Sequence, residues 1–191
     1  MIVGITGPAG SGKSTFARML SEVSPDYVQT AFAESLKAML RTLFGWTREE
    51  LEDPAFKAAE EPGLGVSRRH IMQTLGTDWG RNLVHQELWV QRGLARAIHI
   101  RNTGRIPVLT DVRFENEATA VRSAGGVVVE IVRDGFRRGQ HASEAGLPEH
   151  LVDLRVDNNS LEALKTAARN FDAILRARLD GVDVRLAVWG P

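Results

Sequence analysis

The chain has 191 residues, with 24 basic and 24 acidic side chains and no cysteine. This length allows one α/β domain with a proper core, and the net charge of +0 gives no sign of a general affinity for nucleic acid or anionic membranes. The lack of cysteine excludes disulfides and thiol chemistry, and no apolar run reaches the ~20 residues of a membrane span. We therefore expect a cytoplasmic protein that has neither nucleic acid nor a membrane as a partner.

The first predicted elements are a strand over 2–6 and a helix over 13–22, joined by a glycine-rich loop. The loop, Gly7-Pro8-Ala9-Gly10-Ser11-Gly12-Lys13-Ser14, matches the pattern G-x-x-x-x-G-K-[ST] in the strand–loop–helix context of a phosphate loop. In such a loop, backbone N–H groups hold phosphates, Lys13 reaches the β- and γ-oxygens, and Ser14 ligates Mg²⁺. We therefore predict ATP and Mg²⁺ as cofactors, with the ATP phosphates bound by Gly7, Ala9, Gly10, Ser11, Gly12, Lys13, Ser14 and Thr15.

A strand over 27–32 and a helix over 35–44 follow. The apolar residues of this helix recur at helical spacing, at Leu36, Met39, Leu40 and Leu43. Gly45 is placed to end the helix. Next, Thr47 and Glu50 have the spacing of a capping box, which predicts the start of a further short helix.

Residues 67–82 are predicted to form a helix with Ser67 as its N-cap. One side carries the apolar residues Ile71, Met72, Leu75 and Trp79; the other carries Arg69, Gln73, Gly76, Thr77 and Gly80. Each glycine inside a helix costs about 1 kcal/mol, so the two glycines need a reason. Either a nucleotide lies against the backbone there, with Arg69 on its phosphate and Gln73 on its base, or the glycines admit a neighbouring helix and Arg69 is a solvated charge.

The next predicted strand, 106–110, ends in Asp111-Val112-Arg113 and is followed by a helix over 114–124. This position puts Asp111 and Arg113 at the carboxyl edge of the sheet, where ligands bind in open α/β folds. Asp111 is a candidate to hold Mg²⁺ through water, and Arg113 to grip an acceptor phosphate. The alternative is that Asp111 caps the helix and Arg113 pairs with Glu115 or Glu117.

Strands over 126–132 and 152–156 and a helix over 160–179 complete the pattern. A basic, glycine-containing stretch follows the first of these strands, and it suits a lid that closes over a triphosphate. Its candidates for neutralising transferred phosphoryl charge are Arg133, Arg137 and Arg138. His141 is a weaker candidate, for a hydrogen bond to Glu144 or to a substrate oxygen. The alternation of strands and helices predicts an α/β fold, a parallel sheet with helices on both faces.

The chain resembles the phage-type deoxynucleoside monophosphate kinases, which have the P-loop nucleoside-monophosphate kinase fold. The resemblance rests on the phosphate loop, Phe32-Ala33-x-x-Leu36-Lys37, Arg69-x-x-x-Gln73-Thr74-Leu75-Gly76-Thr77-x-x-Gly80-Arg81, Leu88-Trp89-Val90, Asp111-Val112-Arg113-Phe114-x-Asn116-Glu117 and His141-x-Ser143-Glu144. Together these motifs cover most of residues 1–160. Met72 and Asp78 stand where leucine and glutamate are expected, and neither touches the proposed chemistry.

The resemblance implies ATP-dependent phosphorylation of deoxynucleoside 5′-monophosphates by a single P-loop kinase domain over 1–191. It implies a core at about 1–32 and 105–180, a helical acceptor-binding insertion at about 33–104, and a lid at about 133–150. The expected catalytic residues are Lys13, Asp111, Arg113, Arg133 and Arg137, with Arg138 on the ATP phosphates. The expected substrate residues are Phe32, Lys37, Arg69, Gln73, Gly76, Thr77, Gly80, Trp89, Arg113, His141 and Glu144.

Two other functions stay open from the sequence. A dephospho-coenzyme A kinase, or another small-metabolite kinase, shares the opening Ile5-Thr6-Gly7-x-x-Gly10-Ser11-Gly12-Lys13-Ser14. Its hydroxyl acceptor would need Asp111 as a base. A nucleotide-dependent ATPase or binding protein would hydrolyse ATP without any acceptor. The sequence also leaves open a homodimer, the bases accepted, and a viral or bacterial origin, which decides whether the cytoplasm is that of a host.

Overall fold

The computed structural model describes residues 1–135 and 146–181, and the chain divides into two compact units. Unit 1 consists of Met1–Ala31 and Leu94–Pro191, and unit 2 of Phe32–Gly93. Unit 2 is therefore a continuous stretch of chain that interrupts unit 1.

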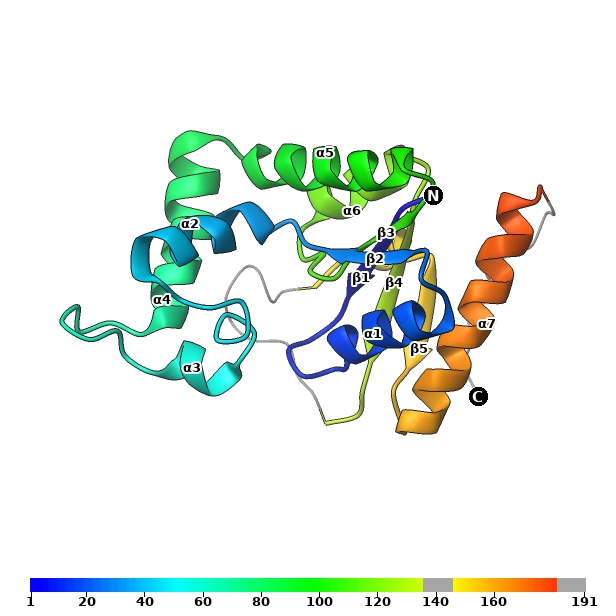
Figure 1. Ribbon diagram of the computed structural model, residues 1–191, viewed down its shortest axis with the longest axis horizontal. Helices are drawn as coiled ribbons and strands as arrows, with labels where there is room; N and C mark the ends of the chain where they lie inside the picture. The colour runs from blue at the N-terminus through cyan, green and yellow to red at the C-terminus, as the bar shows by residue number, and fades with distance from the viewer. Residues whose placement is uncertain (136–145, 182–191) are drawn as a thin grey trace. The chain divides into compact units, whose positions relative to one another are not determined.

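Unit 1 is built on a five-stranded sheet with the order β2-β3-β1-β4-β5, and every neighbouring pair of strands is parallel (Figure 1). The strands are β1 (Val3–Thr6), β2 (Tyr27–Thr30), β3 (Ile106–Leu109), β4 (Val127–Val132) and β5 (Leu154–Asp157). The predicted parallel sheet is confirmed. The strands form where the sequence has short runs of apolar and β-branched residues, as expected of strands buried on both faces.

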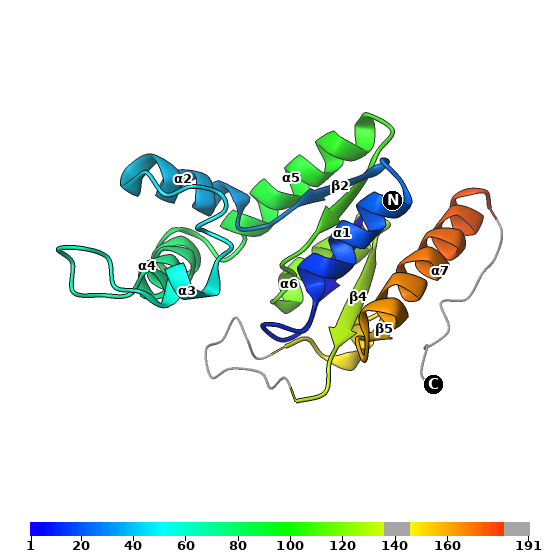
Figure 2. The same ribbon diagram turned by 60° about the horizontal axis from the view of Figure 1, so that its bottom comes forward.

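Helices cover both faces of this sheet. On one face lie α1 (Lys13–Val23) and α7 (Leu161–Leu179), which pack against each other; α6 (Glu115–Ser123) lies on the other face (Figure 2). Because side chains alternate along β1, Val3 and Ile5 belong to the core cluster that contains Phe16 and Phe171, whereas Gly4 faces Val121 of α6. The small Gly4 leaves room for α6 to pack close to the sheet.

The central strand β1 is the point at which the strand order reverses. The chain runs from β1 to β2 and back to β3 on one side, and then reaches β4 and β5 on the other. In open parallel sheets, the crevice at the carboxyl end of such a strand is where ligands bind. The loop that follows β1 therefore occupies the expected ligand-binding position of unit 1.

Unit 2 is helical. Its helices are α2 (Glu34–Phe44), α3 (Pro54–Ala58), α4 (Arg68–Gln73), the π-helix η1 (Thr74–Val84) and the first part of α5 (Leu88–Asn102), which ends in unit 1. They enclose a small core formed by Leu36, Leu40, Trp46, Leu51 and Trp89. Unit 2 thus has a hydrophobic cluster of its own.

Two expectations for unit 2 need correction, and one helix was not expected. Thr47 and Glu50 make both reciprocal bonds of a capping box, at 3.1 and 2.8 Å, but turns follow them in place of the predicted helix. The predicted helix over 67–82 begins as expected, with Ser67 accepting from His70 N, but it changes to π-helix at Thr74. The helix α5 was not predicted from the sequence.

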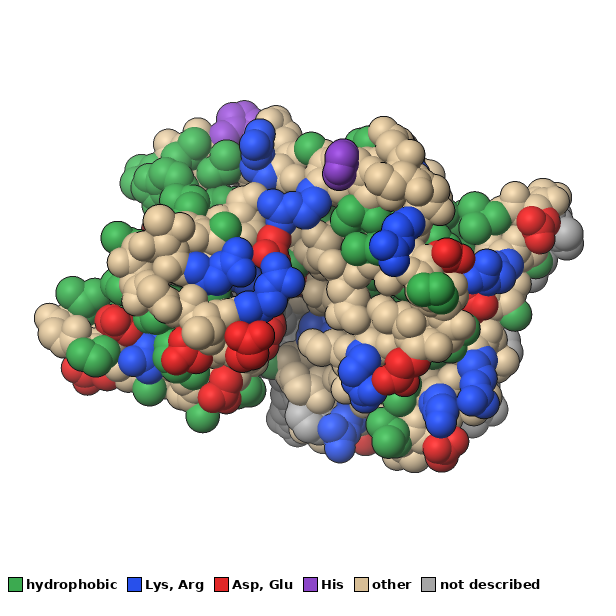
Figure 3. Space-filling view, in the orientation of Figure 1, with side chains coloured by type: hydrophobic (Ala, Val, Ile, Leu, Met, Phe, Trp, Pro, Cys, Tyr) green, Lys and Arg blue, Asp and Glu red, His purple; other side chains and the backbone are tan. Residues whose placement is uncertain are grey.

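The apolar stripe of α2 is only half covered. Leu36 and Leu40 are buried, whereas Met39 and Leu43 are 42% and 73% exposed. Further apolar side chains of unit 2 are exposed as well, at Leu64, Trp79, Leu83 and Val84, and green side chains gather over the region of η1 in Figure 3. Within the described ranges, no helix is both long and apolar enough to cross a bilayer.

Candidate functional site

The loop between β1 and α1 folds as a phosphate loop. Gly7, Gly10 and Gly12 have φ of 136°, 77° and 104°, values that L side chains rarely adopt, so the glycines of the motif are needed for the backbone itself. Ser11 N donates to Pro8 O at 3.2 Å, which closes the turn, and Gly12 lies at the N-cap of α1. The loop thus ends at a helix N-terminus, a position that favours anions.

Lys13 folds its side chain back over this loop. Its Nζ donates to the carbonyl oxygens of Gly7 at 2.7 Å and Pro8 at 2.6 Å. The ammonium group therefore lies at the start of the loop, where it can exchange carbonyl partners for phosphate oxygens. Ser14 is exposed and Thr15 half-buried at the first turn of α1.

Two neighbours hold the loop in place. A Cβ atom on Gly7 would lie 2.3 Å from Ile131 O, so this glycine allows the loop to pack directly on β4. Asn158, which follows β5, donates from Nδ2 to Ser11 O at 2.8 Å. The Ser11 hydroxyl is buried and has no hydrogen-bond partner among the described residues.

The turn after β3 brings Asp111 and Arg113 to the same edge of unit 1. Strands β3 and β1 are neighbours, and Val112 N donates to Ile5 O at 3.1 Å, so this turn lies beside the strand that leads into the phosphate loop. Asp111 is half-buried and Arg113 is exposed. The structure therefore places both at the carboxyl end of β3, as the sequence predicts.

The side chain of Glu117 binds the backbone of this turn. It is buried, and its Oε2 accepts from the backbone N–H groups of Arg113 at 2.7 Å and Phe114 at 3.1 Å. The carboxylate thus engages the backbone at Arg113, and the structure shows no ion pair of the Arg113 side chain with any described residue. The guanidinium of Arg113 is left exposed for an anionic ligand.

Arg133 follows β4 at the same edge of the sheet and is exposed. The other predicted lid residues, Arg137, Arg138, His141 and Glu144, lie outside the described residues.

In unit 2, the two glycines of η1 lie against side chains of neighbouring helices. A Cβ atom on Gly80 would lie 2.5 Å from Nε1 of Trp89, and one on Gly76 would lie 3.1 Å from Leu36 Cδ1. The Trp89 indole is buried and donates from Nε1 to Gly76 O at 2.7 Å. These contacts favour packing against neighbouring helices as the reason for the two glycines, and Arg69 takes no part in them.

The remaining predicted substrate residues of unit 2 have varied surroundings. Lys37 forms an ion pair with Glu52, and Phe32 is buried against Gly93. Arg69 is exposed and Gln73 is half-buried, and neither side chain has a partner in the part of the chain that the structure describes. Thr77 is half-buried on η1. Arg69 and Gln73 therefore have side chains available to a ligand.

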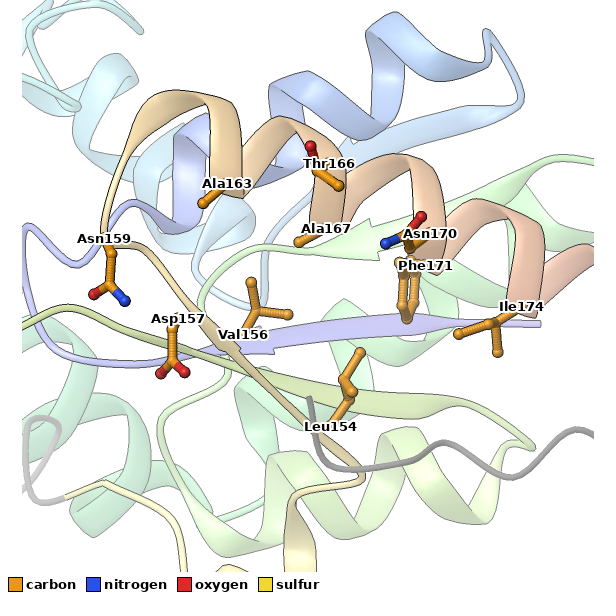
Figure 4. A pocket seen from close by; sticks show the side chains of 10 residues that line it. All are labelled: Leu154, Val156, Asp157, Asn159, Ala163, Thr166, Ala167, Asn170, Phe171 and Ile174. Atoms are coloured by element: carbon orange, nitrogen blue, oxygen red, sulfur yellow. The ribbon is translucent and has the colours of Figure 1, made fainter. Parts of the chain in front are cut away.

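A separate apolar pocket lies in unit 1 between β5 and α7 (Figure 4). Its volume is about 350 Å³, and its lining includes Leu154, Val156, Asn159, Ala167 and Phe171. It contains no residue of the phosphate loop and none of the predicted site residues. We therefore do not assign the nucleotide to it.

The donor set at the phosphate loop suits Mg²⁺. Ser14 offers a hydroxyl and Asp111 a carboxylate, on elements that follow neighbouring strands. Mg²⁺ prefers such oxygen ligands and needs only one or two from protein when phosphates supply others. Within residues 1–135 and 146–181 there is no group of three or more His, Cys, Asp or Glu that could hold a metal alone.

Sequence reasoning missed Asn158 and the positioning role of Glu117. Glu117 has a local signal, since it lies three residues after Phe114, the N-cap of α6. Asn158 has only the general signal of a polar residue after a strand, because its partner Ser11 is 147 positions away in the sequence.

Comparison with known proteins gives a family match and three relatives. Residues 61–167, more than half of the 191-residue chain, match the family model described as deoxynucleotide monophosphate kinase. A protein of Acanthamoeba polyphaga mimivirus, provisionally named a deoxynucleotide monophosphate kinase, is 28% identical over 77% of this chain and 82% of its own length. The deoxynucleotide monophosphate kinase of Enterobacteria phage T4 is 35% identical over 54% of this chain and 44% of its own length. The deoxynucleoside-5′-monophosphate kinase of Escherichia phage T5 is 28% identical over 56% and 46%, so the chain spans less than half the length of the two phage relatives.

Proposed function

The chain belongs to the deoxynucleotide monophosphate kinase family, and from this we propose that it transfers the γ-phosphoryl group of ATP to a deoxynucleoside 5′-monophosphate. The observation that carries the proposal is the phosphate loop at the switch point of the sheet, with Lys13 folded over it. The family match supplies the acceptor, which the loop alone does not specify.

The donor half of the reaction is assigned to unit 1. The backbone N–H groups of Gly7 and of residues 9–15 bind the ATP phosphates, and Lys13 neutralises charge on the β- and γ-oxygens. Ser14, with Asp111 through water, would hold Mg²⁺, which when bound shields the negative charge that an incoming phosphate must approach. Arg133 adds positive charge at the same edge, and Arg137 and Arg138 are proposed to do so from the lid at about 133–150.

The chemical step needs little from the protein beyond positioning and charge. The second pKa of a phosphate monoester is about 6, so near neutral pH an acceptor oxygen already carries the lone pair that attacks the γ-phosphorus. A new P–O bond forms as the bond to the bridging oxygen breaks, and ADP leaves with that electron pair. Arg113 would hold the acceptor phosphate in line with this bond, and no general base is required.

The acceptor half is assigned to the helical insertion, which corresponds to unit 2 with its flanks. Arg69 is proposed to bind the acceptor phosphate and Gln73 the base, because both side chains lack described partners. Phe32, Lys37, Gly76, Thr77, Gly80 and Trp89 are proposed to shape the pocket, with His141 and Glu144 joining from the lid. The expected homodimer stays a prediction.

The test is ADP release from Mg-ATP, measured with each deoxy- and ribonucleoside monophosphate separately. Dephospho-coenzyme A and a reaction without acceptor serve as comparison arms. We expect turnover with one or more deoxynucleotides. Turnover with dephospho-coenzyme A alone would instead make Asp111 a candidate base for a hydroxyl acceptor, and ADP release without acceptor would indicate an ATPase.

Replacing Lys13 tests the donor site. Lys13→Met is expected to lower kcat/KM by at least about 100-fold, the effect of removing one preorganised charge from a transition state. Lys165→Met is the matched control, because Lys165 lies on α7 and is not one of the predicted site residues. Normal turnover by Lys13→Met would contradict the mechanism.

A further inference from the structure

Two consecutive asparagines after β5 have different surroundings. Asn158 donates from Nδ2 to Ser11 O at 2.8 Å, and its backbone N–H donates to Val132 O at 2.7 Å. Asn159 instead lines the apolar pocket beneath α7 (Figure 4). Asn158 therefore connects the end of β4 to the phosphate loop, whereas its neighbour does not.

The Asn158 amide fills the space beside Gly12. A Cβ atom on Gly12 would lie 2.3 Å from Asn158 Nδ2, far inside van der Waals contact. The φ of Gly12 is also 104°, which disfavours any side chain. Glycine at this position is thus required twice, once for the backbone and once for the approach of Asn158.

The contact with Ser11 O sets the orientation of one peptide group. There is no cis peptide bond among the described residues, so the Ser11–Gly12 peptide is trans, and its C=O and N–H point in opposite directions. Because the C=O points at Asn158, the Gly12 N–H points away from Asn158, and no described residue accepts from it. The N–H is therefore available to an anion in the loop at the N-terminus of α1.

Among the described residues, no other side chain bonds to the Ser11 carbonyl oxygen. The Ser11 hydroxyl is buried without a described partner, and its backbone N–H bonds only within the loop, to Pro8 O. The Asn158 amide is thus the side-chain contact that fixes the Ser11 carbonyl.

We propose that Asn158 is a positioning residue of the ATP site: its side-chain amide holds the Ser11–Gly12 peptide so that Gly12 N–H is directed at the ATP phosphates. This inference rests on the proposed function of residues 7–15 as the ATP-binding loop. It assigns no contact between Asn158 and ATP, and the effect passes through the loop backbone.

The first test measures the Kd for Mg-ATP of Asn158→Asp and Asn158→Ala. In Asn158→Asp a carboxylate faces the Ser11 carbonyl oxygen, which favours the flipped peptide, so we expect Mg-ATP binding to weaken by about tenfold or more, the loss of a hydrogen bond to a charged group. Asn158→Ala, which only removes the donor, is expected to weaken binding several-fold. Asn159→Asp and Asn159→Ala are the matched controls and should bind Mg-ATP as the unmodified chain does.

Two further readouts separate positioning from a merely structural role. The KM for ATP should rise in the Asn158 variants while the KM for the deoxynucleotide and the melting temperature stay near those of the unmodified chain. In the unmodified chain, NMR should show that the Gly12 amide exchanges freely with solvent without nucleotide and becomes protected on addition of Mg-ATP. This second measurement can overturn the proposal even if the Asn158 variants fail to fold.

The outcomes distinguish this inference from the proposed function. An unmodified chain that does not bind Mg-ATP would overturn both. An unmodified chain that binds Mg-ATP, together with Asn158→Asp binding it equally well, would overturn the inference alone. A Gly12 amide that is protected before nucleotide is added would do the same, because the N–H would then point into the protein.

Discussion

Gly80 and Gly76 lie on the same helix but differ in what surrounds them. At Gly80 a Cβ atom would meet the rigid, buried indole of Trp89 at 2.5 Å, whereas at Gly76 it would meet the flexible end of Leu36 at 3.1 Å. The Trp89 Nε1 bond uses the backbone oxygen of Gly76, which a side chain there would not remove. The two glycines therefore form a natural matched pair.

We expect Gly80→Ala to lower the free energy of unfolding by about 1–3 kcal/mol, because overpacking a close contact forces neighbours to move. Gly76→Ala should change the free energy of unfolding by less than about 1 kcal/mol, since the higher helix propensity of alanine offsets a mild contact. Urea unfolding of both variants measures the difference. Equal effects of the two substitutions would show that Trp89 does not pack against Gly80 as described.

At the scale of elements, a buried hydroxyl joins β2 to α7. Tyr27 OH donates to Asp172 Oδ1 at 2.9 Å, and Arg176 holds the same carboxylate while also reaching Asp26. Burial, and then the bond to Asp172, raise the pKa of Tyr27 well above its usual value. The charged phenolate is therefore strongly disfavoured in the folded protein.

This shift predicts how stability changes with pH. Tyrosine in the unfolded chain loses its proton at a pKa of about 10, and the folded chain keeps it to higher pH. The free energy of unfolding should thus lose up to about 1.4 kcal/mol per pH unit above 10 from this group, with no effect below it. Tyr27→Phe lacks the group, so the difference in slope between the two proteins isolates it.

A second measurement uses the fact that the chain contains a single tyrosine. The near-ultraviolet absorbance of tyrosinate should not rise near pH 10 in the folded protein and should appear only with unfolding. A normal titration at about pH 10 in the folded state would contradict the buried bond between β2 and α7.

The helices and strands that could be predicted are those with a local pattern of apolar residues in the sequence. The five strands have local apolar runs and were found, and α7 has Leu164, Ala168, Phe171 and Leu175 buried as its spacing predicts. Leu161 fits the same spacing but is 62% exposed because it lies at the first position of the helix.

The errors have physical causes too. Assigning faces by 100° per residue holds for an α-helix, and beyond Thr74 the chain is π-helical, with a different repeat. The segment 88–102 mixes apolar residues with four basic or histidine side chains and shows no clear stripe, so α5 was missed. The capping box at Thr47 formed its bonds, but the box alone does not extend a helix.

In the candidate site, too, residues of a local sequence pattern could be predicted and contacts made by the fold could not. The phosphate loop is a local pattern and could be located from eight consecutive residues, 7–14. The contact from Asn158 to Ser11 and the packing of Trp89 on Gly80 depend on residues brought together by the fold, which no local pattern shows.

At the scale of the whole molecule, the proposed donor residues and most of the proposed acceptor residues belong to different units. Substitutions in unit 2 should therefore alter the KM for the acceptor and leave the KM for ATP unaffected. Arg69 of unit 2 provides the clearest test, because its exposed side chain has no partner in the described ranges.

Arg69→Ala is expected to raise the KM for the deoxynucleotide by about tenfold or more, as a charged contact to phosphate is lost. The KM for ATP should stay within about twofold of its original value. Arg92→Ala removes another exposed arginine of unit 2 that lies outside the motifs, and it should change neither constant. Steady-state kinetics with both substrates varied gives all four values, and an increase confined to the KM for ATP would exclude Arg69 from the acceptor site.

The central place of β1 also governs the order in which the molecule can assemble during translation. Its partners in the sheet, β3 and β4, contain residues 106–109 and 127–132, and Asn158 comes later still. At roughly 5–20 residues per second, several seconds of synthesis separate the phosphate loop from the strands that support it. The strand β1 and the phosphate loop thus leave the ribosome well before β3 and β4, and until those strands follow, β1 lacks both of its neighbours in the sheet.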